Sequence, residues 1–520
     1  MRGAPNALLG HTFAGMLIAR RRGPCVLPGA LGSGMVSFVE LQSRLGAALE
    51  ANTAASTVPH VLVALPSLSV GESLLSHYAD RIPAMEHRYL LAALMLPRIE
   101  SCELVFVSCA APSSEVLDYY LSLAPAGRRA SMRDRFQVLE VPDRTARSVA
   151  AKLLDRPDLI AELRASLRGR LAFIEPWNVT DHEVELAGRL GVPINGTSPQ
   201  LWPLGFKSAG RKLFAEAGVP MPYGHEDVRS ADDVVEAALE IKSRRPRAPG
   251  VVIKTDDSGA GDGNQVIRFV EPATPGELRA AVHALPEWYL ADLAAGGVVE
   301  ELVVGLAGSS PSVQVNISPD GEPIVVATHE QVLGGPTGQV FTGCRFPADP
   351  IYSARIATYA KDVGALLARH GAVGRLSVDF VAAQDADGRW DVYALEINLR
   401  KGGTTHPYAA LRNLVPGRYD SESGRWISLD GSPRCYQATD NLVDPSWLGR
   451  PPGEVIRGVN EAGLKFDSRT GTGVVLHMLS CLAIDGRLGL TALGTSPEHA
   501  AKLYSATAEL MSGLTSPARP

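Results

Sequence analysis

Glu396, Asn398 and Arg400 occupy every second position of one run of the sequence. Side chains alternate between the two faces of a β-strand, so these three residues are expected on one face. Asp379 lies on an earlier strand-like run, and the Asp387-Gly388 pair between the two runs is a strong hairpin signal. Three oxygen ligands beside a cation suit Mg²⁺ that is shared with phosphate groups, and Mn²⁺ is an alternative. The other interpretation is a polar hairpin face exposed to water.

A lysine at the end of an apolar run, followed by a glycine-rich loop, is a second place for phosphate chemistry. Val251 to Lys254 is typical of a β-strand, and the loop after it contains Ser258, Gly259, Gly261 and Gly263. Backbone N–H groups of such a loop can cradle phosphates. It is neither a Walker loop nor a dinucleotide fingerprint, because Gly-Lys-Ser/Thr is missing and another strand follows. A hairpin turn with a solvated lysine is the alternative interpretation.

Two more segments carry polar groups beside these runs. Lys401 to His406, with the sequence Lys-Gly-Gly-Thr-Thr-His, follows Arg400 directly and offers donors for an anion. Val298 to Gly305 is an apolar strand-like run interrupted by Glu300 and Glu301. It is either an edge strand or a linker between two lobes whose backbone could face an adenine edge.

The composition limits the class of protein that these residues belong to. A chain of 520 residues exceeds the size of one hydrophobic core, so two to four domains are expected. The formal net charge of -6, without a long Lys/Arg run, argues against a nucleic-acid partner. The six cysteines show neither close pairs nor high density, which favours cytoplasmic thiols. No apolar run is long enough to span a membrane, and we expect no membrane partner.

The elements that must position these residues follow an alternating pattern. From residue 58 short β-rich runs alternate with helical patterns, which predicts a Rossmann-like domain with a parallel sheet to about residue 203. A new unit begins with a helix near residue 207, and its strands continue to about residue 400. We expect a polar, Gly/Ser-rich excursion over residues 417–433, and strand and helix patterns return after it.

In this order the segments resemble the ATP-grasp superfamily, from Phe206-Lys207 through Ala217-Gly-Val-Pro220 to Arg400-Lys-Gly-Gly403. The resemblance implies α/β and α+β domains, with ATP and Mg²⁺ held in a two-lobed ATP-grasp domain after a Rossmann-like one. By position it assigns phosphate binding to Lys207, Lys254 and the loop Ser258–Gly263, the adenine hinge to Glu300, Glu301 and Val303, metal binding to Asp379, Glu396 and Asn398, and the cation beside the transferring phosphoryl group to Arg400. Gly305-Leu306 lacks the acidic residue that often binds ribose, and Leu399 stands where relatives often have proline.

A closer likeness is to the pheganomycin-type peptide ligases of natural-product biosynthesis. It rests on Glu330–Pro336, Gly343–Pro347, Asn398–Pro407 and Gly473–Met478. The domains implied are an N-terminal extension, partly disordered, over 1–57, a Rossmann-like domain over 58–203, an ATP-grasp domain over 204–416, and a C-terminal domain over 417–520. Such enzymes join an amino-acid-like carboxylate to the amine of an amino acid or peptide through an acyl phosphate. A homodimer is the default oligomer.

Substrate contacts are the least determined part of this expectation. His406 and His477 are candidates for accepting the proton of the incoming ammonium, and structural roles are the alternative. Arg375 shares a strand face with Asp379, so it either binds a substrate carboxylate or pairs with Asp379. The remaining substrate candidates are Arg345, Gly402, Gly403, Thr404 and Thr405. Two other functions stay open, namely an ATP-grasp phosphotransferase without ligation and a non-catalytic ATP-binding protein.

Overall fold

The computed structural model describes residues 37–68, 75–76, 79–258, 264–269, 274–334 and 340–513. These residues divide into two compact units. The described residues of Tyr223–Leu302 form one unit, called the small unit below, and the other described residues form the large unit. Each unit is described by itself.

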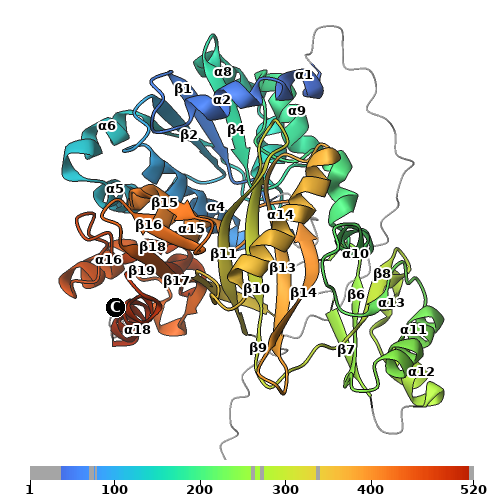
Figure 1. Ribbon diagram of the computed structural model, residues 1–520. Coiled ribbons are helices and arrows are strands. Elements are labelled where there is room, and N and C mark those ends of the chain that lie inside the picture. Colours follow the sequence, from blue (N-terminus) through green and yellow to red (C-terminus); the bar gives the residue numbers. More distant parts are fainter. Residues whose placement is uncertain are drawn as a thin grey trace, which may run out of the picture. The chain divides into compact units, whose positions relative to one another are not determined.

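A four-stranded parallel sheet begins the large unit, in the order β3-β2-β1-β4 (Figure 1). Its strands are β1 (His60–Leu65), β2 (Cys102–Ser108), β3 (Phe136–Glu140) and β4 (Leu171–Pro176). All of β1 is buried, as expected for a parallel strand covered on both faces. The helices around it are α1 (Phe38–Gln42), α2 (Leu45–Ala51), η1 (Ala79–Arg81), α4 (Ile82–Glu86), η2 (His87–Met95), α5 (Ser114–Leu123), η3 (Ala126–Arg128), α6 (Arg129–Asp134), α7 (Val149–Leu154), α8 (Pro157–Leu167) and α9 (Asp181–Leu190). The predicted Rossmann-like sheet is confirmed.

An antiparallel sheet forms the rest of the large unit, and its described part has eleven strands. Its main path is β14-β13-β10-β11-β12-β17-β16-β15, with β9 beside β13 and with β19 and β18 beside β17. The strands are β9 (Gly308–Ser309), β10 (Pro311–Ile317), β11 (Pro323–Gly334), β12 (Val340–Phe346), β13 (Gly374–Gln384), β14 (Trp390–Asn398), β15 (Gly417–Asp420), β16 (Arg425–Ser428), β17 (Pro433–Val443), β18 (Gly473–His477) and β19 (Arg487–Gly494). The helices are η4 (Pro199–Gly205), α10 (Lys207–Glu216), α14 (Ser353–Arg369), α15 (Thr405–Leu414), η5 (Pro445–Trp447), α16 (Pro452–Glu461), η6 (Leu479–Cys481), α17 (Leu482–Asp485) and α18 (Pro497–Gly513).

Helix α14 covers one face of this sheet, over β10, β11 and β13 (Figure 1). Ile356, Val363 and Leu367 follow a helical period, and all three are fully buried. They pack with Val378 and Phe380, which alternate along β13. The apolar residues of β13 thus face α14, and the polar residues between them point to the opposite face.

The predicted hairpin between β13 and β14 is confirmed. The two strands pair antiparallel, and the turn between them has Gly388 at φ +81°, a conformation that glycine adopts easily. Asp385 stabilises the turn, because its Oδ1 accepts the N–H groups of Asp387 and Arg389 at 2.9 Å each. This hairpin sets which residues of the two strands face each other.

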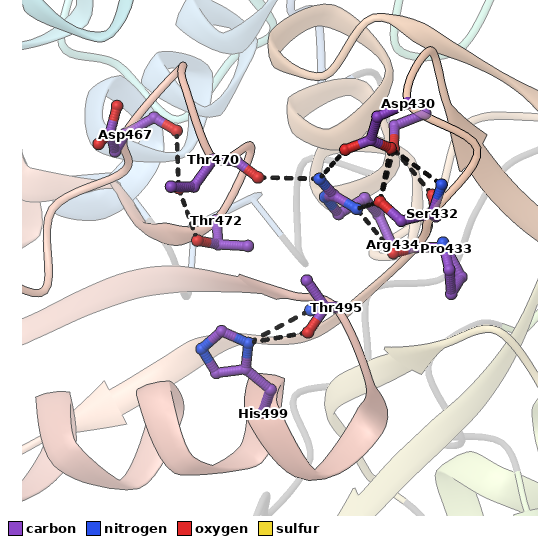
Figure 2. Close-up of polar contacts among 10 residues, drawn as sticks. Asp430, Ser432, Pro433, Arg434, Asp467, Thr470, Thr472, Thr495 and His499 are labelled. Carbon is purple, nitrogen blue, oxygen red and sulfur yellow. Dashed lines mark hydrogen bonds and ion pairs between the residues drawn. The ribbon is translucent and has the colours of Figure 1, made fainter.

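The polar, Gly/Ser-rich segment over residues 417–433 contains two strands that the sequence did not predict. β15 and β16 form a hairpin that joins β17, with Trp426 and Ser428 buried on one face of β16. The Gly and Ser residues of this segment lie largely at its turns, which hid the short strands. Arg434, at the start of β17, ties two neighbouring loops together: it donates to the carbonyl of Thr470 at 2.9 Å and pairs with Asp430 at 3.4 Å (Figure 2).

This antiparallel sheet includes strands from both sides of the boundary predicted between residues 416 and 417, because β17 pairs with both β12 and β19. The domain boundaries proposed from the sequence stay predictions. In the described part of the chain, no helix is long and apolar enough to cross a membrane.

The small unit is an antiparallel sheet in the order β5-β8-β6-β7 with three helices. Val235, Val251 and Val299 belong to its buried core. The elements are β5 (Gly224–His225), α11 (Ala231–Arg244), β6 (Gly250–Thr255), β7 (Asn264–Arg268), α12 (Pro275–His283), α13 (Glu287–Leu293) and β8 (Gly297–Glu301).

Candidate active site

Two carboxylates face each other across the β13–β14 hairpin. Asp379 is paired with Glu396, and Ser377 with Asn398. The register shifts after Asp379, so the pairing is irregular at the carboxylate pair itself. Bulges of this kind re-aim side chains and are frequent beside active sites. The three predicted metal ligands therefore lie together in the large unit.

Hydrogen bonds connect these side chains to one another and to neighbouring elements. The Asn398 amide nitrogen donates to Asp379 at 3.2 Å and to Glu396 at 3.1 Å. Ser312, on β10, donates to Asp379 at 2.6 Å. Lys207, at the start of α10, places its Nζ 2.7 Å from Glu396. Lys207 was predicted to bind phosphate, and it lies beside the predicted metal ligands.

The proximity of the two carboxylates has an electrostatic cost. Burial, together with the negative charge of Glu396, raises the pKa of Asp379 to about 7. Like charges this close favour a cation beside them. Carboxylate and amide oxygens are the donors that Mg²⁺ prefers, so this set of residues fits that ion.

Arg400 follows β14 directly and adds positive charge near the pair. Burial lowers the pKa of its guanidinium, while the charges of Glu396 and Asp379 oppose that shift. Its Nη1 donates to the Lys401 carbonyl at 3.2 Å. Arg400 is thus a partly buried cation near two carboxylates, and its role beside a phosphoryl group stays a prediction.

In the small unit, Lys254 and Glu300 form a buried ion pair. The Lys254 Nζ lies 2.5 Å from the Glu300 carboxylate, on the adjacent strands β6 and β8. The Ser258 hydroxyl donates to the Thr255 carbonyl at 2.9 Å, which holds the start of the predicted phosphate loop. Gly259, Gly261 and Gly263 lie outside the described residues. Lys254 and Glu300 therefore lie together, and their nucleotide contacts stay predictions.

Both acidic side chains of the predicted adenine hinge, Glu300 and Glu301, already have partners. Glu301 accepts the Tyr223 N–H at 2.9 Å and lies 3.6 Å from Arg245. Val303 belongs to the large unit, and the described residues give its N–H and C=O no hydrogen-bond partner. A free backbone edge of this kind suits pairing with an adenine edge, as the prediction for Val303 requires.

The family described as PGM1 C-terminal domain matches residues 454–507. Among curated proteins, the L-propargylglycine--L-glutamate ligase of Streptantibioticus cattleyicolor is 34% identical over 457 residues, covering 84% of this chain and 92% of that protein. This chain belongs to the ATP-grasp ligases. The likeness is to the pheganomycin-type branch that the sequence motifs predicted.

A solved structure supports the fold of the ligase. The chain is similar to biotin carboxylase from Campylobacter jejuni, crystallised with β-γ-ATP, with a TM-score of 0.53 and 16% identity. The alignment covers 87% of this chain and 94% of that one. The α/β and α+β multidomain fold expected from the sequence is confirmed. As an ATP-grasp ligase, the enzyme takes ATP with Mg²⁺.

His406 and His477 come together around a residue of the ligase that sequence reasoning missed. Each histidine Nε2 lies 2.7 Å from the same oxygen of Asp440, and the ring centroids are 4.8 Å apart. Arg88, on η2, binds the other oxygen of Asp440 at 2.9 Å. Burial lowers the pKa of His406 to about 4, so this ring is neutral at pH 7. Asp440 stays ionised, because His406, His477 and Arg88 hold its pKa well below the usual range although burial opposes them.

The His406–Asp440–His477 group has the donor types of a metal site, with ligand atoms within 4.8 Å of one another. However, Arg88 already balances the charge of the carboxylate. A divalent ion would leave an uncompensated buried positive charge. Hydrogen bonding without a metal accounts for the group.

The loop before α15 lies near both clusters. The Thr404 hydroxyl accepts the Gln314 amide at 3.0 Å, and the Gly402 N–H donates to Thr405 at 3.1 Å. A Cβ on Gly403 would overlap the Phe341 ring, so glycine is required there. The loop is thus held in place at each of these predicted substrate residues.

The two arginines proposed as substrate contacts lie far apart in the sheet. Arg345 is exposed on β12, opposite Glu330, and two strands, β10 and β11, lie between β12 and β13 in the strand order. Arg375 is on β13 and donates to Gln314 at 3.2 Å. No ion pair joins Arg375 to Asp379 in the described residues, so the structure favours the first of its two predicted roles.

The residues that sequence reasoning missed come from other strands and helices. They are Arg88, Ser312, Gln314 and Asp440. Each is brought to the site by pairing or packing between segments far apart in the chain. No local pattern in the sequence singles these four residues out.

Proposed function

We propose that this ligase forms an amide bond between the carboxylate of one amino acid and the amine of another amino acid or a peptide, releasing ADP and phosphate. The observation that carries the proposal is the pairing of Asp379 with Glu396, with Lys207 2.7 Å from Glu396. A partly buried carboxylate pair beside a lysine suits a metal ion on nucleotide phosphates.

In the proposed reaction, an oxygen of the donor carboxylate attacks the γ-phosphorus of ATP. The bond from that phosphorus to the β,γ-bridging oxygen breaks, which gives an acyl phosphate and ADP. The amine nitrogen then attacks the acyl carbon, loses a proton, and expels phosphate. Lys207, Lys254 and Arg400 neutralise charge on the phosphates during the transfer.

Asp379, Glu396 and Asn398 are the residues that would hold Mg²⁺. When bound, the ion supplies charge neutralisation and alignment to the phosphate oxygens. Asn398 now directs its amide nitrogen at both carboxylates. Turning that amide would present its oxygen, which is the donor an ion needs.

His406 and His477 are proposed to serve the amine half-reaction. With Nε2–H donating to Asp440, a neutral imidazole keeps Nδ1 as the proton acceptor. Both Nδ1 atoms are buried and have no partner among the described residues. Asp440 is then a positioning residue, because it selects this tautomer.

The curated relative is named for L-propargylglycine and L-glutamate, and these two amino acids are the first substrates to assay here. We place the enzyme in natural-product biosynthesis on the same ground. The cytoplasmic location and the homodimer expected from the sequence stay predictions.

The test is a screen of amino acids and dipeptides in pairs, beginning with L-propargylglycine and L-glutamate. ADP, phosphate and condensed product should form in equal amounts, and only when both substrates are present. ADP release without an amine, with a phosphorylated product, would identify a phosphotransferase instead. ATP binding without turnover for every pair would contradict the enzyme assignment.

A further inference from the structure

Arg375 lies on the same strand face as the predicted metal ligand Asp379. The two residues are four positions apart on β13, with Ser377 between them on that face, which places their Cα atoms about 13 Å apart. The apolar residues of β13 point the other way, toward α14. One polar face thus carries the carboxylate pair at one point and a guanidinium further along.

The guanidinium of Arg375 is poorly satisfied. Its Nη1 donates to Gln314 at 3.2 Å, and its Nε is buried without a hydrogen-bond partner. Across the described ranges, Arg375 takes part in no ion pair. A buried cation without a counter-charge is costly, so an anion is expected to complete this site.

The carboxylate of Glu175, whose charge acts on Arg375, is already engaged. Glu175, at the end of β4, lies 2.7 Å from the Lys401 Nζ and accepts the Asn195 amide at 2.7 Å. Its charge acts on Arg375 only at longer range. Glu175 therefore does not provide the missing partner.

A second arginine strengthens the positive potential around Arg375. Burial first, and then the charge of Arg412 on α15, lower the pKa of Arg375 to about 10. Arg412 also lowers the pKa of Arg98, after burial. The described part of the chain shows no ion pair for Arg98 or Arg412 either. Repulsion among these arginines would fall if an anion bound between them.

Gln314 connects Arg375 to the reaction centre. Its carbonyl oxygen accepts from Arg375, and its amide nitrogen donates to the Thr404 hydroxyl at 3.0 Å. Thr404 belongs to the loop that begins at Arg400 beside the carboxylate pair. An anion bound to Arg375 would therefore be held at a fixed position relative to the site of phosphoryl transfer.

We propose that Arg375 binds a substrate carboxylate that the reaction does not consume, namely the free α-carboxylate of the substrate that supplies the amine. The planar guanidinium suits two parallel hydrogen bonds to a carboxylate. The enzyme would then take amino acids or peptides with a free carboxyl terminus and reject their amides. This inference rests on the proposed ligase function.

The experiment compares each amine substrate as the free acid and as its α-amide, starting with L-glutamate and L-propargylglycine and using product mass to identify which one supplies the amine. The wild-type enzyme should prefer the acid on the order of 10²-fold in kcat/KM, since one partner of a buried charge pair is missing in the amide. Arg375→Met should reduce that preference to near one, and Arg375→Lys should retain part of it.

Arg369→Met is the matched control, because Arg369 is an exposed arginine of α14 paired with Glu216. It should keep the wild-type preference, and all variants should keep the wild-type KM for ATP within about twofold. A wild-type enzyme that uses acid and amide equally well would overturn the inference, whether or not any variant folds. So would an Arg375→Met enzyme that still prefers the acid. If no pair of substrates yields an amide, the ligase proposal fails, and the inference fails with it.

Discussion

Asp379 and Glu396 are expected to be stable together only beside positive charge, because burial and mutual repulsion act on both. Lys207 and Arg400, both in the large unit, provide this positive charge near the two carboxylates. The same cations and Mg²⁺ would act on ATP. At the scale of single residues, the function proposed here depends on this balance of charges.

Glu396→Gln should reduce kcat by about 10² to 10³, because one ligand of the metal and one partner of Lys207 are lost. ADP formation measures this effect, and circular dichroism checks that the fold is retained. Glu322→Gln, an exposed change in the β10–β11 turn, should leave kcat unchanged. Normal turnover by the Glu396 variant would refute the metal assignment.

The sequence predicts that Glu396, Asn398 and Asp379 lie together on one face of a hairpin. Strand alternation and the hairpin turn are local properties, so this prediction needs no knowledge of distant contacts. Asp440 could not be predicted. It lies between paired residues of β17, where the register with β19 shifts after Thr439. Its meeting with Arg88 of η2 depends on packing between distant segments.

His87, on η2, connects two elements that are remote in sequence. Its Nδ1 lies 2.8 Å from the Ser480 hydroxyl of η6, and its Nε2 lies 2.9 Å from the Ala110 carbonyl. Burial lowers the pKa of His87 to about 4, so the folded protein keeps this ring neutral. The unfolded chain binds a proton at His87 near pH 6.5, so acid favours unfolding.

His87→Gln should therefore change how stability depends on pH. Between about pH 6.5 and 4, His87 lowers the free energy of unfolding by about 1.4 kcal/mol for each unit of acidification. Urea unfolding of both proteins across this range measures the difference in slope. His283→Gln, on α12 of the small unit, is the control. Equal slopes for wild type and His87→Gln would contradict a buried neutral His87.

Leu367→Ala tests the packing of α14 on the antiparallel sheet of the large unit. Leu367 is fully buried with Val378 and Phe380, so its truncation should cost about 2–5 kcal/mol of stability. Ile351→Ala, at a residue that is 59% exposed, should cost far less. Urea unfolding measures both, and a loss below 1 kcal/mol for Leu367→Ala would contradict this packing.

Helices and strands could be predicted from the sequence where their apolar pattern extends over enough residues. The periodic apolar residues of α14 and the buried run of β1 have such patterns. β15 and β16 were missed because four-residue strands between Gly- and Ser-rich turns carry too few alternations. Their burial comes from tertiary contacts, including the edge-on packing of Trp426 against Tyr408.

At the scale of the whole molecule, a ligand that binds only the folded protein stabilises it. MgATP at about 100 times its Kd should raise the free energy of unfolding by about 2.7 kcal/mol. Removing Mg²⁺ with EDTA should abolish most of this gain. Thermal unfolding with ATP, with and without EDTA, measures it. Equal stabilisation in both conditions would show that ATP binding does not need the metal.

The most direct test of the proposed reaction follows the oxygen atoms of the donor carboxylate. With a donor amino acid labelled with ¹⁸O in that carboxylate, attack on the γ-phosphorus moves one labelled oxygen into the acyl phosphate. The amine then expels phosphate that carries this oxygen. Mass spectrometry should therefore find one ¹⁸O in the phosphate released for each amide formed. Amide formation with unlabelled phosphate would contradict the acyl-phosphate mechanism.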